Sequence, residues 1–317
     1  MNCLHCGRPL ADAQKAAGWH PRCIKRFFGT KALPQIEISQ ETFQHLVDES
    51  TNKGVTVPGV QKKLSMHLFS DKQPRLTLMN HPAGYILKPQ VKEFEALPEA
   101  EHLVMSMAQA CGIATVPHAL VRLEDGWAYI TRRVDRTFAP GVPVGLLAME
   151  DFCQLDLRLT QDKYRGSYER CANIITRHSS RPGLDLSELY LRLVFCFVAG
   201  NSDMHLKNFS LLETEERSGQ YALSPAYDLL PVNLVMPEDQ EQTALTLNGK
   251  KANIRRKDFL LFAQNCGISI KAADRMLINM LSFVPQMLGM VEQSLLPLDM
   301  RQRFQLLISQ RAGVLEG

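Results

Sequence analysis

The chain has 317 residues, a formal net charge of +3 and a sequence pI near 8.4. This length can hold two lobes and a small module, while so mild a charge gives no argument for nucleic-acid binding by itself. No apolar run reaches the length of a membrane span and no secretion signal precedes the first cysteines, so we expect no membrane contact and a reducing cytoplasmic location.

The N-terminal residues 1–35 have the spacing of a structural zinc module. Cys3 and Cys6 form C-x₂-C, and His20 and Cys23 form H-x₂-C after a spacer of thirteen residues. Three thiolates and one imidazole make a closed tetrahedral Zn²⁺ site, which stabilises a fold without doing chemistry. His5 is a rival ligand, although its place between the two cysteines would strain the ring. The alternative is that the cysteines are surface thiols near a chain end.

The end of this module is basic and aromatic. Phe27 and Phe28 lie among four basic residues: Arg22, Lys25, Arg26 and Lys31. Aromatic and basic side chains together can track a nucleic-acid backbone and stack on bases. The interpretation that we favour is that both phenylalanines pack the module onto the rest of the protein while the charges face water.

A glycine-bearing loop is followed by a lysine on a strand-like segment. Gly54 and Gly59 would let backbone N–H groups approach phosphate oxygens. Lys88 follows Tyr-Ile-Leu and precedes Pro89, which predicts a strand end facing a cleft. There it could neutralise nucleotide phosphates, whereas the alternative is an ordinary solvated lysine.

An amphipathic helix is predicted next, because apolar residues recur at positions 103, 104, 107 and 110. We expect Glu101 in its first turn, where it could pair with Lys88. The alternative is a carboxylate that only complements the helix dipole.

Three polar residues suited to phosphoryl transfer lie between Gly200 and Asp228. Asp203 and Asn208 are expected on a loop after the apolar run LYLRLVFCFVAG, and Asp228 follows the strand-like YALSPAYD. One carboxylate could take a hydroxyl proton, while an amide oxygen and a second carboxylate could hold Mg²⁺. Taken singly, such residues are also common turn caps.

The C-terminal half is predicted to be mainly helical. A polar, turn-rich stretch is expected at 177–187, and almost the whole chain after Ala252 is expected to form helices with Met and Leu in the core. The segment 163–165 could shape a substrate groove or be a surface loop. Most of the cysteines outside the N-terminal module are expected to be buried apolar residues.

Several of these motifs together resemble one family. VTVPGVQKK, YILKP, EAEHLVMSMAQACGI, ITRRVDR, MEDFCQ, DKY, AGNSDMHLKNFSLL and SPAYDLL resemble the HipA-like serine/threonine kinases, the toxins of bacterial HipBA-type modules, over residues of about 50 to about 310. The resemblance implies a two-lobed, protein-kinase-like α+β fold. We expect the zinc module at 1–35, a small β-rich N-lobe at 36–133 and a helical C-lobe at 134–317, with ATP bound between the lobes.

The resemblance also implies roles for individual residues. Asp203 would be the catalytic base, Lys207 a cation near the transferred phosphoryl group, and His205 a residue that shapes the loop. Asn208 and Asp228 would bind Mg²⁺. The residues implied in ATP binding are Val57, Pro58, Gly59, Val60 and Gln61 of the phosphate-covering loop, Lys88 with Glu101, and Arg132, Val134 and Asp135 of the hinge.

The chain differs from the best-known relatives in three places. Thr56 stands where they carry an autophosphorylated serine, and Pro58 replaces a second serine. Arg132 and Val134 replace an acidic and an aromatic hinge residue. The stretch ahead of the Gly-rich loop is too short for the usual N-terminal subdomain, which is the mark of HipT kinases, whose modules also encode a HipS-like protein and a HipB-like helix-turn-helix antitoxin.

The resemblance therefore implies an ATP- and Mg²⁺-dependent serine/threonine protein kinase that acts as a toxin. Its expected substrate is a protein, with an aminoacyl-tRNA synthetase as the implied target, and DNA would be contacted only through the antitoxin. Autophosphorylation at Thr56 is expected. The alternatives are an inactive scaffold, which the intact Asp203, Asn208 and Asp228 oppose, a small-molecule kinase, and a zinc-dependent nucleic-acid binder.

Overall fold

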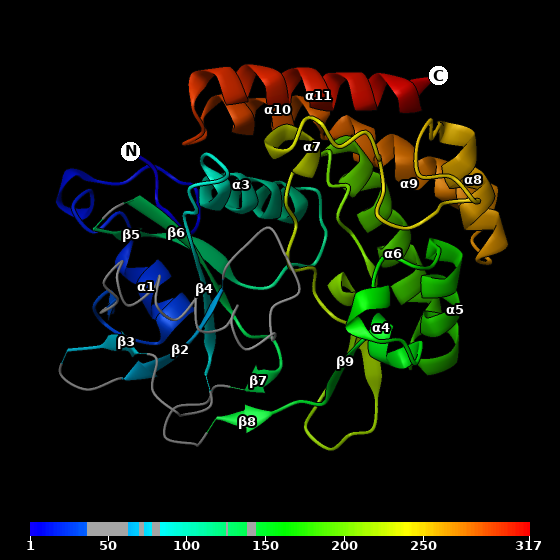
Figure 1. The fold of residues 1–317 in the computed structure, drawn as a ribbon. Helices are drawn as coiled ribbons and strands as arrows, with labels where there is room; N and C mark the ends of the chain where they lie inside the picture. Colours follow the sequence, from blue (N-terminus) through cyan, green and yellow to red (C-terminus); the bar gives the residue numbers. More distant parts are fainter. Residues whose placement is uncertain (37–62, 70–72, 78–82, 125, 138–143) are drawn as a thin grey trace. The chain divides into compact units, whose positions relative to one another are not determined.

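The structure, a computed structural model, describes residues 1–36, 63–69, 73–77, 83–124, 126–137 and 144–317. The chain divides into two compact units (Figure 1). Unit 1 comprises residues 1–102 and 116–144, and unit 2 comprises residues 103–115 and 145–317. The predicted phosphate loop, Thr56 and Val57 to Gln61, lies outside the described residues.

Unit 1 is built on a six-stranded sheet in the order β1-β3-β2-β4-β6-β5. Its strands are β1 (Gln35–Ile36), β2 (Leu64–Phe69), β3 (Arg75–Thr77), β4 (Tyr85–Pro89), β5 (His118–Leu123) and β6 (Gly126–Arg132). The central strand β4 pairs antiparallel with both β2 and β6, so that Leu87 lies opposite Ile130. Both of these side chains are fully buried, which places the core of unit 1 around β4.

The N-terminal module packs on this sheet through aromatic side chains. It contains η1 (Asp12–Gln14) and α1 (Pro21–Phe28), which begins at a proline suited to the first turn and ends at Gly29 with a left-handed φ of 76°. Phe27 and Phe28 are buried and contact the ring of Tyr85 in β4. These two residues therefore pack the module onto the sheet and do not form an exposed surface for stacking on bases.

Helix α3 (Leu97–Ala110) begins earlier than the apolar pattern predicted. Leu97 opens the helix and Pro98 occupies its second position, which is where a missing backbone N–H costs least. Glu101 is therefore the fifth residue of the helix, and Glu99 is the acidic residue of the first turn. The expectation that Glu101 lies in the first turn is wrong, because a hydrophobic period marks the buried face of a helix and not its cap.

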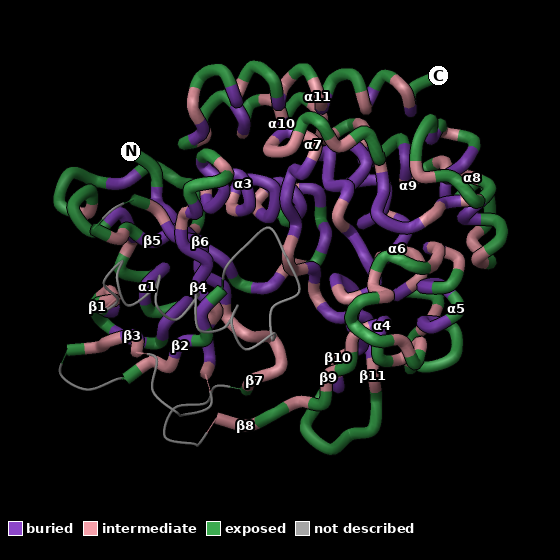
Figure 2. The backbone as a smooth tube through the Cα atoms, viewed as in Figure 1, coloured by how far each residue is buried: buried purple, intermediate pink, exposed green. Residues whose placement is uncertain are grey.

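Unit 2 is organised around α6 (Pro182–Val198), whose side chains from Leu189 onward are almost all buried. Figure 2 shows this helix as a mostly buried segment. It begins within the stretch 177–187 that we expected to be turn-rich, since Pro182 lies in the first turn and its fixed φ suits that position. Of this stretch, Arg177 and His178 end α5, residues 179–181 connect the two helices, and residues 182–187 belong to α6.

Unit 2 contains further strands and helices besides α6. They are the strands β9 (Met149–Asp151), β10 (Ser210–Glu213) and β11 (Tyr221–Leu223), the helices α4 (Phe152–Leu155), α5 (Tyr168–His178), α7 (Val232–Val235), α8 (Arg256–Asn265), α9 (Ile270–Ser282), α10 (Val284–Glu292) and α11 (Leu298–Glu316), and the single turns η2 (Thr160–Asp162) and η3 (Leu206–Asn208). The short segment β7 (Arg136–Thr137) belongs to unit 1, whereas β8 (Gly145–Leu146) belongs to unit 2. Strands β9, β10 and β11 form one sheet with β10 in the middle. The predicted helical content after Ala252 is confirmed.

A Schellman motif ends α6 and turns the chain into the loop that carries Asp203. Gly200 has a left-handed φ of 67°, the N–H of Asn201 donates to the carbonyl of Cys196, and the N–H of Gly200 donates to the carbonyl of Phe197. A Cβ at Gly200 would lie 2.6 Å from Cδ2 of Leu307 in α11. Both the backbone angle and the packing therefore require glycine here.

Among the described residues, none of the helices combines the length and the apolar character that crossing a bilayer requires.

Candidate functional site

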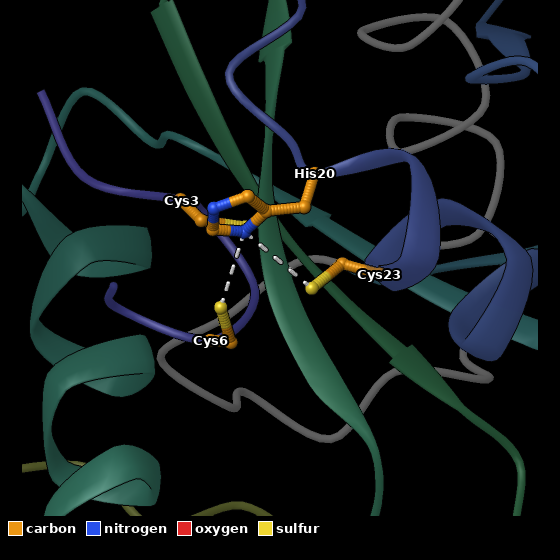
Figure 3. A group of neighbouring side chains, drawn as sticks. All are labelled: Cys3, Cys6, His20 and Cys23. Carbon is orange, nitrogen blue, oxygen red and sulfur yellow. Dashed lines mark hydrogen bonds between the residues drawn. The ribbon is translucent and has the colours of Figure 1, made fainter. Parts of the chain in front are cut away.

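Four side chains of the N-terminal module converge in the arrangement of a metal site (Figure 3). The ligand atoms of Cys3, Cys6, His20 and Cys23 all lie within 4.8 Å of one another. Nδ1 of His20 is 3.4 Å from Sγ of Cys6 and 3.8 Å from Sγ of Cys23. The four predicted residues are thus brought together, and His5 lies outside the group, with Nδ1 at 3.1 Å from the carbonyl oxygen of His118.

The surroundings of these ligands suit a cation. Nε2 of His20 lies 3.0 Å from the carbonyl oxygen of Pro9, and a proton donated there leaves Nδ1 as the ligand atom. Burial alone would raise the pKa of Cys3, but backbone N–H groups of Cys6, His5 and His20 lower it to about 7. Burial and the neighbouring thiols raise the pKa of Cys23 to about 12. A divalent cation would remove that repulsion between thiolates.

The module is attached to two strands of the sheet. The N–H of Leu120 in β5 donates to the carbonyl of Leu4 at 3.0 Å, and the hydroxyl of Tyr85 in β4 donates to the carbonyl of Phe27 at 3.2 Å. Because Leu4 lies between two candidate ligands, the metal-binding loop is held directly on the edge strand of the sheet.

A buried ion pair joins β4 to α3. Nζ of Lys88 lies 2.7 Å from Oε1 of Glu101, with side chains that are 8% and 0% exposed. The ammonium also lies 5.5 Å from the ring centroid of Tyr129 on β6. A charge pair so far from water is costly to build, because both groups lose their hydration. The predicted pairing of Lys88 with Glu101 is present.

The predicted hinge residues follow β6. Arg132 is the last residue of β6, and Val134 lies two residues beyond it. Asp135 accepts hydrogen bonds from Arg133 at 3.0 and 2.7 Å and from Arg136 at 2.6 Å. Burial would raise the pKa of Asp135, but the two guanidinium groups hold it below its ordinary value. The charge of Asp135 is therefore largely matched within its own turn.

The loop after α6 anchors Asp203 by backbone hydrogen bonds on both sides. Its N–H donates to Oδ1 of Asn201 at 3.0 Å, and its carbonyl accepts from Nδ2 of Asn208 at 2.8 Å. Burial is the main cause that raises the pKa of the Asp203 carboxyl to about 6, and the nearby charge of Asp228 adds to it. A carboxyl group with a pKa near neutrality is suited to accepting a proton.

Asn208 and Asp228 are the two candidate Mg²⁺ ligands. Asn208 is buried at the end of η3. Its amide nitrogen donates a hydrogen bond to the carbonyl of Asp203, which leaves its amide oxygen as the possible metal ligand. Asp228 has a left-handed φ of 59°. A non-glycine residue in that conformation stores strain and is found disproportionately at functional sites.

The other two residues of the predicted motif have structural contacts. His205 is buried, and burial, with the charge of Lys163 next in size, lowers its pKa to about 4, so the imidazole is neutral at physiological pH. Nζ of Lys207 lies 2.6 Å from Oδ2 of Asp151 at the end of β9. The ammonium is thus held by a carboxylate from a distant segment.

Three polar residues contact the loop that carries Asp203 through hydrogen bonds that sequence reasoning did not predict. Tyr164 donates a hydrogen bond to Oδ1 of Asp203 at 2.7 Å, and Asp239 accepts one from Ser202 at 2.7 Å. Asp151 is the partner of Lys207. Two of them lie in motifs that had been recognised, DKY and MEDFCQ, but their contact partners are 39 and 56 residues away, a separation that no local pattern reveals.

Comparison with known families gives a match over most of the chain. The model of the family described as "HipA-like C-terminal domain" matches residues 55–288. A Sinorhizobium fredii protein named "Putative kinase Y4dM" is 30% identical over 232 residues, which are 68% of this chain and 54% of that protein. The chain therefore spans about half the length of this curated relative.

Two solved structures resemble the fold. Shewanella oneidensis HipA, in a complex with HipB and operator DNA, has a TM-score of 0.71 at 20% identity and covers 83% of this chain, which in turn covers 65% of the HipA chain. The Helicobacter pylori proinflammatory kinase CtkA has a TM-score of 0.53 at 12% identity, with coverages of 79% and 93%. The predicted kinase-like α+β fold is thus confirmed.

Proposed function

Because the chain belongs to the HipA-like C-terminal domain family, we propose that it is an ATP- and Mg²⁺-dependent serine/threonine protein kinase. The observation that carries this proposal is the loop after α6, where Asn208 donates a hydrogen bond to the carbonyl of Asp203, and where the charge of Asp228, from the segment after β11, acts on the Asp203 carboxyl. A base and two oxygen ligands are the groups that phosphoryl transfer needs from a protein.

The proposed roles follow from the chemistry of each group. Asn208 and Asp228 would hold Mg²⁺, which supplies positive charge to the phosphate oxygens of ATP. Asp203 would accept the proton of the substrate hydroxyl as its oxygen attacks the γ-phosphorus and the bond to the β-phosphate oxygen breaks, so that ADP leaves. Lys88, fixed by Glu101, would neutralise the α- and β-phosphates.

The roles proposed for the other residues are less direct. The neutral His205 would shape the loop. Lys207, whose ammonium group is also bound by Asp151, would place positive charge near the transferred phosphoryl group. Residues 57–61 would cover the phosphates, residues 131–135 would contact adenine and ribose, and Thr56 would be an autophosphorylation site.

We propose a structural Zn²⁺ ion at Cys3, Cys6, His20 and Cys23. Support comes from the convergence of four ligand atoms, the orienting contact of His20 with Pro9, and the backbone N–H groups around Cys3. Such an ion would hold the N-terminal loop on the edge of the sheet without entering the reaction.

The biological role proposed is that of the toxin in a HipBST-type toxin–antitoxin module. HipA of Shewanella oneidensis was solved with HipB and DNA, and this supports a HipB-like antitoxin as a partner here. A HipS-like protein and an aminoacyl-tRNA synthetase substrate rest on the family resemblance alone. Contact with DNA would be indirect, through the antitoxin.

The test is phosphoryl transfer by the purified full chain. Wild type and Asp203→Asn are incubated with MgATP, first alone and then with a panel of aminoacyl-tRNA synthetases, and phosphorylated residues are located by mass spectrometry. We expect phosphate on serine or threonine with wild type only. Phosphate on neither the chain nor any synthetase, from a preparation that binds ATP, would refute the protein-kinase proposal in favour of a scaffold or a small-molecule kinase.

A further inference from the structure

The segment Asp162 to Gly166 lies directly on the loop that carries Asp203. The N–H of Leu206 donates to the carbonyl of Lys163 at 3.1 Å. The ring of Tyr164 contacts the His205 ring edge-on, with centroids 5.0 Å apart and planes at 80°. Its hydroxyl then reaches Oδ1 of Asp203 at 2.7 Å. The two segments are therefore joined by a backbone bond, a ring contact and a side-chain hydrogen bond.

The Asp203 carboxylate is held by one oxygen only. Tyr164 donates to Oδ1, and within the described part of the chain no hydrogen bond reaches Oδ2. Asn201 and Asn208 fix the backbone of Asp203 but do not touch its carboxylate. Tyr164 is thus the group that sets the rotation of the carboxylate, while the other oxygen remains able to accept a proton.

We propose that Tyr164 is a positioning residue that orients the Asp203 carboxylate so that Oδ2 receives the hydroxyl of the substrate. This inference rests on the proposed kinase function. In the transfer step the substrate O–H bond breaks, its proton moves to Oδ2 and its electron pair forms the new oxygen–phosphorus bond. The bond between the γ-phosphorus and the bridging oxygen breaks, and ADP leaves with the electron pair of that bond. The Tyr164 hydroxyl stays protonated throughout, and its O–H donates a hydrogen bond to Oδ1.

The exposure of Tyr164 argues against a purely structural role. Its side chain is 44% exposed, so its hydroxyl could be satisfied by water without any protein partner. Holding an exposed side chain on a carboxylate costs conformational entropy, which a hydrogen bond to an ionised group offsets. The Lys163 ammonium, 4.9 Å from the centroid of the ring, further restrains the tyrosine.

Tyr168 provides a matched control. It begins α5, is buried, and donates its hydroxyl to the carbonyl of Met204 at 3.2 Å. It therefore supports the same loop by the same kind of group, but it does not touch the carboxylate. Tyr164→Phe and Tyr168→Phe each remove one hydroxyl from the neighbourhood of Asp203.

The experiment measures initial rates of phosphoryl transfer from MgATP to dephosphorylated casein, and of ATP hydrolysis, by the full chain and both variants. For Tyr164→Phe we expect kcat to fall about tenfold, as for a misaligned base, with both KM values within about twofold and an unchanged Tm. For Tyr168→Phe we expect a lower Tm and a kcat within about twofold of wild type. This split between kcat and stability separates positioning from support of the fold.

Three results would overturn the inference while leaving the kinase function intact. One is a kcat for Tyr164→Phe equal to that of wild type. Another is a higher kcat or a lower KM for casein, which would mean that Tyr164 blocks the acceptor position. The third is phosphate on Tyr164 itself, which would make it an acceptor. If wild type transfers no phosphoryl group to casein, to water, to itself or to any synthetase, the proposed function fails and this inference falls with it.

Discussion

The buried pair of Lys88 and Glu101 allows a thermodynamic test of unit 1 that is also a test of function. We consider Lys88→Met, Glu101→Leu and the double variant. The side chains are 8% and 0% exposed, so each single change takes from one buried charge the oppositely charged group that it contacts. Such a loss costs about 3–5 kcal/mol, whereas replacing both charges by apolar groups of similar size is close to neutral.

The expected free energies of unfolding follow from these values. Each single variant should lose about 3–5 kcal/mol, a large part of the roughly 5–15 kcal/mol typical of a folded domain. The double variant should be more stable than either single variant. Its loss should therefore be far below the sum of the two, which gives a large coupling energy.

The assay is urea unfolding followed by tryptophan fluorescence. Trp19 and Trp127 are the two tryptophans of the chain and both belong to unit 1, so the signal reports on the part that contains the pair. The double variant should recover stability but not phosphoryl transfer, because the uncharged methionine side chain that replaces Lys88 cannot neutralise phosphate.

Two results would refute this reasoning. If Lys88→Met cost less than about 1 kcal/mol, Glu101 would not be a buried charge that depends on Lys88. If the double variant regained turnover, the role of Lys88 would be limited to satisfying Glu101, and it would not bind nucleotide.

Three further predictions concern the metal, pH and the turn before Asp203. The purified chain should carry about one Zn²⁺ per molecule. Both the Cys6→Ser substitution and a strong chelator should remove the ion and lower the Tm. A purified chain that holds no metal and keeps its Tm in the chelator would contradict the zinc proposal. Burial lowers the pKa of His118 from 6.5 to about 4, so the unfolded chain binds the extra proton between these values, and His118 alone should lower stability by about 2 kcal/mol at pH 5 relative to pH 7. Burial lowers the pKa of His205 in the same way, so His118→Asn should reduce the pH dependence in urea titrations by its own share without abolishing it, and an unchanged slope would exclude a contribution from His118. Gly200→Ala should lower the free energy of unfolding by about 1–3 kcal/mol, because the φ at this position is positive and the added Cβ would contact Leu307. Gly219→Ala should cost less, because its φ of 63° is similar but no atom lies within 4 Å of the added Cβ. Equal losses in thermal unfolding would show that the contact with Leu307 does not contribute to the cost at Gly200.

Features that depend on short spacing could be predicted from the sequence. The C-x₂-C and H-x₂-C pairs place their ligands together because a tight turn and the first turn of α1 bring each pair within reach of one ion. Asp203 and Asn208, five residues apart, share one loop for the same reason. The apolar run 189–198 similarly predicted the buried helix α6.

Features that depend on distant segments were decided by the tertiary structure. No period or spacing indicates that Tyr164 donates to Asp203 or that Lys207 pairs with Asp151, because side chains that lie far apart along the chain meet only when the segments between them have packed. The sequence positions offered the pairing of Lys88 with Glu101 as one of two alternatives, but its depth of burial follows from the tertiary packing. The sequence by itself thus determined which groups this protein carries, while packing decided which of them touch and how far their charges lie from water.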